Sequence, residues 1–114
     1  MTAELNDVIR GALDNLKGQN CISLDVVGLS DITDTMIVIS GTSDRHVKSL
    51  AANVIDAGKH QGYRPISVEG IEAGDWVLID YGDTIVHVML PQTRSFYDLE
   101  SLWRPMASSP TDEK

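Results

Sequence analysis

The sequence has one cysteine, no long apolar run and too few basic residues to balance its acidic ones. Because a single cysteine cannot form an internal disulfide, we expect a reduced, cytoplasmic compartment, with Cys21 as a small core residue. No apolar stretch is long enough to span a bilayer, and the acidic, amphipathic start MTAELNDVIR is unlike a signal peptide. These absences argue against a secreted or membrane protein.

The net charge of the chain indicates which kind of partner it can bind. The 114 residues carry nine basic and seventeen acidic side chains, a formal net charge of −8, with no basic cluster along the chain. Such a surface repels phosphate backbones, which argues against direct nucleic-acid binding and favours a basic protein as partner. The alternative is that the acidic surplus serves solubility alone.

The apolar pattern that is present predicts one small domain built from helices and five strands. Apolar residues from Leu5 to Leu16 recur at helical spacing, and Gly18 is placed to end that helix. A strand–helix–strand order then predicts a parallel pair joined by a right-handed crossover. The segments expected after the first helix are strands at 21–27 and 35–40, a helix from 43 to about 62 and a strand at 65–69. We expect residues 1–104 to form this single domain and residues 105–114 to form a disordered tail.

The second half contains a clear hairpin. DWVLIDY and TIVHVML flank Gly82-Asp83, a dipeptide suited to a two-residue turn. One face of the paired strands is then uniformly aliphatic and belongs on the core. The other face is mixed, so that either a helix covers it or a partner binds it. The expected pairs are Tyr81 with Thr84, Ile79 with Val86, Leu78 with His87, and Trp76 with Met89.

The stretch SGTSDRHVKSLA, residues 40–51, raises the question of chemistry. It lacks the second glycine of a P-loop or dinucleotide fingerprint, and Asp44 in the first helical turn would repel a phosphate. Ser43 and His46 have the spacing of a nucleophile and its base, but Thr42 or Ser43 is better placed to cap the helix. We therefore expect capping here and no catalytic residue.

A nucleotidyl transferase is the remaining enzyme class, because a similar turn after a strand begins its active site. Such an enzyme needs closely spaced carboxylates to hold magnesium. No Asp-x-Asp or Asp-x-Glu lies on a predicted strand, and the three histidines have no metal-ligand spacing. We expect neither a metal nor a cofactor.

Interface-type side chains gather late in the chain instead. Tryptophan, tyrosine, methionine and arginine are enriched in protein interfaces, and several occur from residue 76 onward. In SFYDLESLW, residues 95–103, Phe96, Leu99 and Trp103 would share one face of a short helix. The alternative is that the two tryptophans merely close a small core.

The motifs SGTSDRHVKSLA, Glu69-Gly70, DWVLIDYGDTIVHVM and FYDLESLW together resemble the ribosomal silencing factor family, also called the Iojap-like family. The resemblance runs from about Leu5 to Trp103, with the motifs in the family's order. It implies an α/β (α+β) domain with a mixed five-stranded sheet flanked by helices, similar to the fold of nucleotidyl transferases without their catalytic carboxylates. It also implies a homodimer that binds ribosomal protein L14 of the large subunit, blocks joining of the small subunit and represses translation when nutrients are limiting.

Carried over to this chain, the resemblance implies a contact surface late in the sequence. The segment Asp44, Arg45 and His46 would belong either to that surface or to the dimer. The competing hypothesis from the residues alone is a nucleotide-binding or nucleotidyl transferase-like enzyme. The candidate contact residues are Trp76, His87, Met89, Arg94, Tyr97, Asp98, Leu99 and Glu100.

Overall fold

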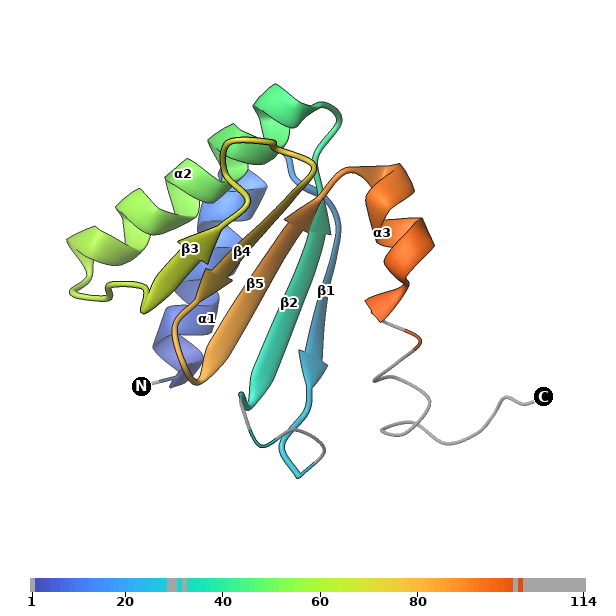
Figure 1. Cartoon of the computed structure of the whole chain (residues 1–114). Coiled ribbons are helices and arrows are strands. Elements are labelled where there is room, and N and C mark those ends of the chain that lie inside the picture. The colour runs from blue at the N-terminus through green and yellow to red at the C-terminus, as the bar shows by residue number, and fades with distance from the viewer. Residues whose placement is uncertain (1, 29–30, 32, 100, 102–114) are drawn as a thin grey trace.

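The computed structural model describes residues 2–28, 31, 33–99 and 101. Within these residues the chain forms three helices and five strands (Figure 1). The predicted tail at 105–114, together with Glu100 and Trp103, lies outside the described residues. The elements in order are α1 (Thr2–Asn15), β1 (Gln19–Asp25), β2 (Thr35–Ser40), α2 (Asp44–His60), β3 (Ser67–Glu69), β4 (Trp76–Asp80), β5 (Thr84–Met89) and α3 (Pro91–Tyr97).

The strands form one mixed sheet in the order β1-β2-β5-β4-β3, which confirms the predicted fold class. β2 and β5 are parallel, and the other three neighbouring pairs are antiparallel. β2 and β3, the strands on either side of α2, run in the same direction, but β5 and β4 separate them. The parallel pair that hydrogen bonds is therefore β2 with β5, a long-range pairing that the strand–helix–strand order did not reveal.

The hairpin has the predicted register. Trp76 lies opposite Met89, Leu78 opposite His87 and Ile79 opposite Val86. The Tyr81 amide donates to the Thr84 carbonyl at 2.9 Å and closes the turn. This register determines which side chains of β4 and β5 share a face, because alternate residues of a strand lie on opposite faces of the sheet.

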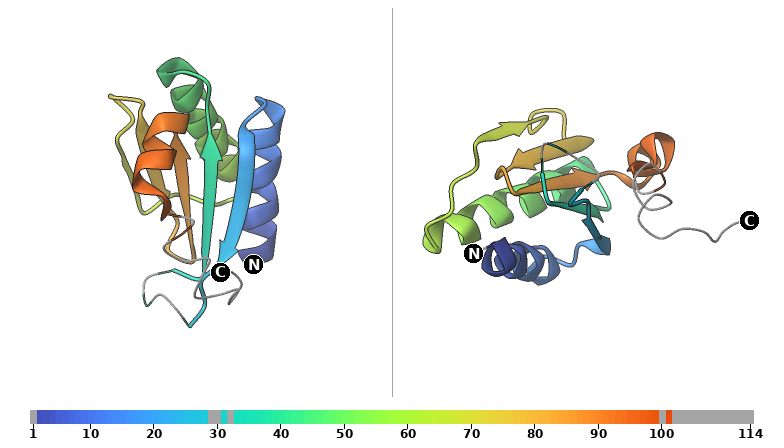
Figure 2. Two further views of the ribbon diagram at one scale, coloured as in Figure 1. Left: turned by 90° about the vertical axis from the view of Figure 1, so that its right-hand side faces the viewer. Right: turned by 90° about the horizontal axis from the view of Figure 1, so that it is seen from below.

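The two faces of the sheet are covered differently. α1 and α2 lie side by side on one face, and α3 lies on the other, near one end of β2 (Figures 1 and 2). The face under α1 and α2 holds the predicted aliphatic residues of the hairpin, and all of them are fully buried. These are Val77, Ile79, Val86 and Val88.

The end of α1 differs from the prediction in one residue. Lys17, with φ of 61°, is the left-handed residue, and the Gly18 amide donates to the Leu13 carbonyl at 2.9 Å. This is the hydrogen bonding of a Schellman motif with Lys17, not Gly18, at its left-handed position. Gly18 is needed for close packing instead, because a Cβ there would overlap the side chain of Ile39.

Two further predictions are wrong. Cys21 is exposed on β1, the edge strand, and is not a core residue. The helix expected over residues 95–103 begins earlier, at Pro91, and ends at Tyr97, because Asp98 adopts a left-handed backbone with φ of 49°. Phe96 and Leu99 therefore do not share one face of a continuous helix, and Phe96 is 80% exposed.

Candidate protein-binding surface

Three aromatic rings form a continuous strip from α3 onto the sheet. Trp76 begins β4, and Tyr97 is the last residue of α3; their ring centroids are 4.6 Å apart. The ring of Phe96 meets that of Tyr97 edge-on, at 5.0 Å. Phe96 and Tyr97 are exposed, and Trp76 is half-buried. We call Phe96, Tyr97 and Trp76 the aromatic strip.

His87 fixes the position of the Trp76 indole. The Nε1–H group of Trp76 donates to Nδ1 of His87 at 3.0 Å, so that the neutral imidazole carries its proton on Nε2. Nε2 is buried and has no hydrogen-bond partner among the described residues. Burial lowers the pKa of His87 from 6.5 to about 4, because the charged form loses its hydration. Neutral His87 is thus the form that accepts from Trp76.

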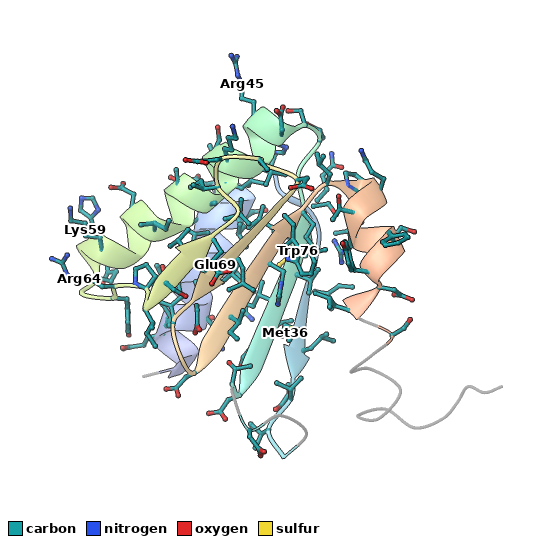
Figure 3. All side chains as sticks on the ribbon, viewed as in Figure 1. Met36, Arg45, Lys59, Arg64, Glu69 and Trp76 are labelled. Carbon is teal, nitrogen blue, oxygen red and sulfur yellow. The ribbon has the colours of Figure 1, made fainter. Side chains whose placement is uncertain are left out.

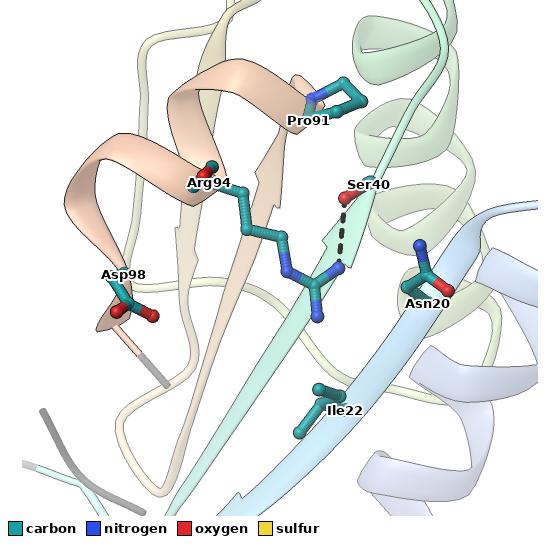
Figure 4. Close-up of a pocket in the computed structure, with 7 residues that line it drawn as sticks. Asn20, Ile22, Ser40, Pro91, Arg94 and Asp98 are labelled. Carbon is teal, nitrogen blue, oxygen red and sulfur yellow. Dashed lines mark hydrogen bonds between the residues drawn. The ribbon is translucent and has the colours of Figure 1, made fainter. Parts of the chain in front are cut away.

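Met89 and Arg94 are both buried between α3 and the sheet face that carries Trp76. Met89 is fully buried and forms a small second core with Met36 and Val38. Arg94, which is 8% exposed, donates from Nη1 to the Ser40 hydroxyl at 3.0 Å and so ties α3 to β2 (Figure 4). In this conformation Met89, His87 and Arg94 offer little surface of their own to a partner.

The remaining candidate contact residues follow the end of α3 in the sequence. Asp98 is exposed, and its amide donates to the Arg94 carbonyl at 2.8 Å, which caps the helix. Leu99 is half-buried against the second core. Glu100 lies outside the described residues. The structure therefore brings Trp76, Tyr97, Asp98 and Leu99 into one area.

The earlier motif has a structural role at the start of α2. The Ser43 hydroxyl accepts from the His46 amide at 3.1 Å and is the N-cap that the sequence predicted. The Thr42 amide donates to Nδ1 of His46 at 2.8 Å, and Nε2 of that ring lies 2.8 Å from the Leu16 carbonyl oxygen. Nε2 therefore carries the proton and donates it. His46 thus joins the end of α1 to the loop before α2.

Asp44 and Arg45 are the first two residues of α2. Both are exposed, and Arg45 extends from the N-terminal end of α2, away from Trp76 (Figure 3). Asp44 packs against Gly74, in the loop just before Trp76, so only Arg45 is placed on a separate part of the surface.

Other kinds of site have little support within the part of the chain that the structure describes. No group of three histidine, cysteine, aspartate or glutamate side chains there could hold a metal ion. No helix there is both long and apolar enough to cross a membrane. The Ser43 hydroxyl, the nucleophile of the catalytic interpretation, is used by the backbone.

Sequence reasoning missed two features of this area. Phe96 was expected on one helix face with Leu99 and Trp103 and was not among the candidate contact residues, yet it is the most exposed ring of the aromatic strip. Glu69, noted only as part of a family motif, lines a pocket of about 270 Å³ beside Trp76 with Gly70 and Leu78. The signal that could have found Glu69 is the position of its strand beside β4, which the sequence did not reveal.

Comparisons with known proteins agree on one family. A family model described as "Ribosomal silencing factor during starvation" matches residues 2–114. A protein named ribosomal silencing factor from Chromobacterium violaceum is 44% identical over 100 residues, which cover 88% of this chain and 82% of that protein. The mouse protein named "Mitochondrial assembly of ribosomal large subunit protein 1" is 39% identical over 74 residues, 62% of this chain and 32% of its own length. A crystal structure of a Chromobacterium violaceum protein matches with a TM-score of 0.88 at 40% identity, covering 98% of this chain and 92% of that one.

Proposed function

The chain belongs to the ribosomal silencing factor family, and from that premise we propose that it binds the large ribosomal subunit and sterically blocks the small one from joining. The partner on the large subunit is ribosomal protein L14, and the protein acts in the cytoplasm to repress translation when nutrients are limiting. The mechanism needs no covalent chemistry. A protein bound at the joining surface excludes the small subunit by occupying its place.

The observation that carries this proposal is the aromatic strip. Tyr97 is 53% exposed and Phe96 80% exposed, and both rings continue the surface of Trp76. Large rings at this exposure cost solubility unless a partner covers them, and tryptophan and tyrosine dominate binding energy at protein interfaces. Phe96 and Tyr97 belong to α3, which lies on the sheet face that α1 and α2 leave open (Figure 2).

Charge supports a protein of the ribosome as the partner. A net charge of −8 is attracted to a basic ribosomal protein and repelled by ribosomal RNA. Glu69, which lines a pocket with Trp76, and Asp98, which follows Tyr97 in the chain, are both exposed acidic residues near the strip. The name of the mouse relative refers to the large ribosomal subunit, which is the subunit proposed here.

We further propose that the protein is a homodimer. Arg45 is exposed at the N-terminal end of α2 and extends away from Trp76, so a dimer contact there leaves the strip available. Asp44 and His46 would join this contact because they are adjacent to Arg45 in the chain. Sedimentation equilibrium tests the dimer directly, and an Arg45→Glu variant should shift the population toward monomer.

Cosedimentation with purified large subunits tests the main proposal. The wild-type protein should pellet with large subunits at low salt and be released as salt is raised. Trp76→Ala and Tyr97→Ala should each weaken binding by about tenfold or more, the effect of removing an interface hot spot. Both variants must first be shown to be folded by circular dichroism.

A control variant is Lys59→Ala, an exposed residue near the end of α2 and far from the strip (Figure 3). It should bind as the wild type does. Failure of the wild-type protein to pellet at low salt would overturn the proposed function.

A further inference from the structure

A small pocket adjoins the aromatic strip on the open face of the sheet. Its walls are Glu69, Gly70, Trp76 and Leu78, and its volume is about 270 Å³. Glu69 lies directly opposite Leu78 in the β3–β4 ladder, and Trp76 is two residues from Leu78 on the same strand. All three side chains therefore lie on one face (Figure 3). Pockets for small molecules start at about 300 Å³, so this one suits a single side chain.

Only glycine at position 70 allows the close backbone contact that forms one wall of the pocket. Gly70 has φ of 84°, and a Cβ added there would overlap the carbonyl oxygen of Trp76. Its own carbonyl accepts from the Gly74 amide at 3.1 Å, which closes the turn after β3. The backbone beside Glu69 is thus packed directly on the backbone of Trp76. This contact holds the backbone of Glu69 next to that of Trp76, while the Glu69 side chain itself is exposed.

The chemistry of the lining is that of a site for a cation with an apolar stem. An indole attracts cations over its face, a leucine packs against methylene groups, and a carboxylate pairs with an ammonium or guanidinium. None of the lining residues is basic. Glu69 forms no salt bridge to any other residue within 2–28, 31, 33–99 and 101. Its charge is available to a partner.

We propose that this pocket receives one lysine or arginine side chain of the ribosomal protein that binds the aromatic strip. The stem of that side chain packs on Trp76 and Leu78, and its cationic head lies beside the Glu69 carboxylate. The inference rests on the proposed function, since the donor of the side chain is the proposed partner. It adds a residue that sets specificity, because a neutral or acidic side chain would leave Glu69 without a counter-charge at the interface.

Other occupants fit the pocket less well. A phosphate of ribosomal RNA would meet the negative charge of Glu69. A purely apolar side chain would gain the contacts with Trp76 and Leu78 but would desolvate the carboxylate without compensation. The net charge of −8 favours a basic partner in general. The Glu69 carboxylate in the pocket favours a basic side chain at this particular position.

The test compares the affinity of two Glu69 variants for purified large subunits over a range of salt concentrations. Glu69→Gln keeps the shape and removes the charge, and should weaken binding about threefold to tenfold while flattening its salt dependence. Glu69→Lys places two like charges together and should weaken binding by at least about thirtyfold. Thermal melting confirms that both variants fold.

Glu72→Gln is the matched control. It makes the same change at an exposed residue of the following turn that does not line the pocket, and should leave affinity within about twofold. If the wild type binds and Glu69→Gln binds as tightly as Glu72→Gln, the cation pocket is wrong and the proposed function stands. If Glu69→Gln binds more tightly than wild type, the occupant is anionic and the inference is also overturned. If the wild type itself fails to bind, the proposed function has failed.

Discussion

On β4 and β5, Val77, Ile79 and Val86 point toward α1 and α2, whereas Trp76 and His87 point toward the face that those helices leave open. The first set is fully buried among apolar neighbours. The second set includes a buried imidazole whose Nε2 has no partner among the described residues, and an indole that contacts an exposed ring at an interplanar angle of 47°. Adjacent residues of the same strands thus serve different ends. One face stabilises the fold, and the other, which we propose binds the partner, keeps a buried nitrogen without a hydrogen bond to any described residue.

The largest contrast should appear when neighbouring residues of β4 are truncated. Ile79 is fully buried, and Ile79→Ala should lower the free energy of unfolding by about 2–5 kcal/mol through lost burial and the cavity left behind. Urea denaturation followed by circular dichroism measures this loss. At temperatures where the variant remains folded, its affinity for large subunits should be unchanged.

Leu78→Ala is the matched truncation on the open face. Leu78 is half-buried and lines the pocket beside Trp76, so its truncation should cost less stability than that of Ile79 and weaken binding. Equal losses of stability for the two variants would mean that both faces are packed alike, contrary to the comparison above.

The second contrast concerns pH. Because the pKa of His87 is about 4 in the folded protein and near 6.5 when unfolded, only the unfolded chain takes up a proton between those values. Stability should therefore be unaffected above pH 6.5 and fall as the pH drops toward 4, by up to about 3 kcal/mol from this residue. Urea denaturation at several pH values from 7 to 4 measures the loss.

His87→Gln separates this effect from the other titrating groups. A glutamine carbonyl can still accept from Trp76 Nε1, but it does not titrate. The variant should lose less stability than wild type between pH 6.5 and 4. Parallel curves for the two proteins would show that His87 is not the source of the pH dependence.

A smaller effect is expected where α3 is tied to the sheet. Ser40→Ala removes the hydroxyl that accepts from Arg94 and should lower the free energy of unfolding by about 1–2 kcal/mol. Because the same contact positions α3, and Tyr97 with it, affinity for large subunits should fall as well. Ser49→Ala, at an exposed position of α2, is the control and should change neither quantity. An unchanged affinity in Ser40→Ala would mean that α3 is positioned by other contacts.

The sequence predicted local features well and long-range ones poorly. The apolar run from Thr35 to Ser40 has the predicted ends, and the hairpin register follows from one turn dipeptide, because both depend on neighbouring residues. The burial of His87 and Met89 was not foreseen, since alternation assigns a residue to a face but does not say what covers that face. Likewise, nothing in residues 95–103 marks Asp98 as the left-handed end of α3, because that backbone usually calls for glycine or asparagine. Because α3 ends there, Phe96 and Leu99 do not share the helix face that the sequence predicted.

A substitution at Phe96 should separate the effect on binding from the effect on stability most clearly, because its side chain is the most exposed of the aromatic strip. Its side chain is 80% exposed, so Phe96→Ser should change the free energy of unfolding by no more than about 0.5 kcal/mol. Its ring continues the surface of Tyr97, so the same change should weaken binding to large subunits about fivefold. Ile66→Ser provides the control, since Ile66 is 72% exposed but lies outside the aromatic strip. If both substitutions weaken binding equally, exposed apolar area in general drives association, and the aromatic strip has no special role. If only Phe96→Ser does so while both proteins melt as the wild type does, the open face binds the ribosome through residues that the fold does not need.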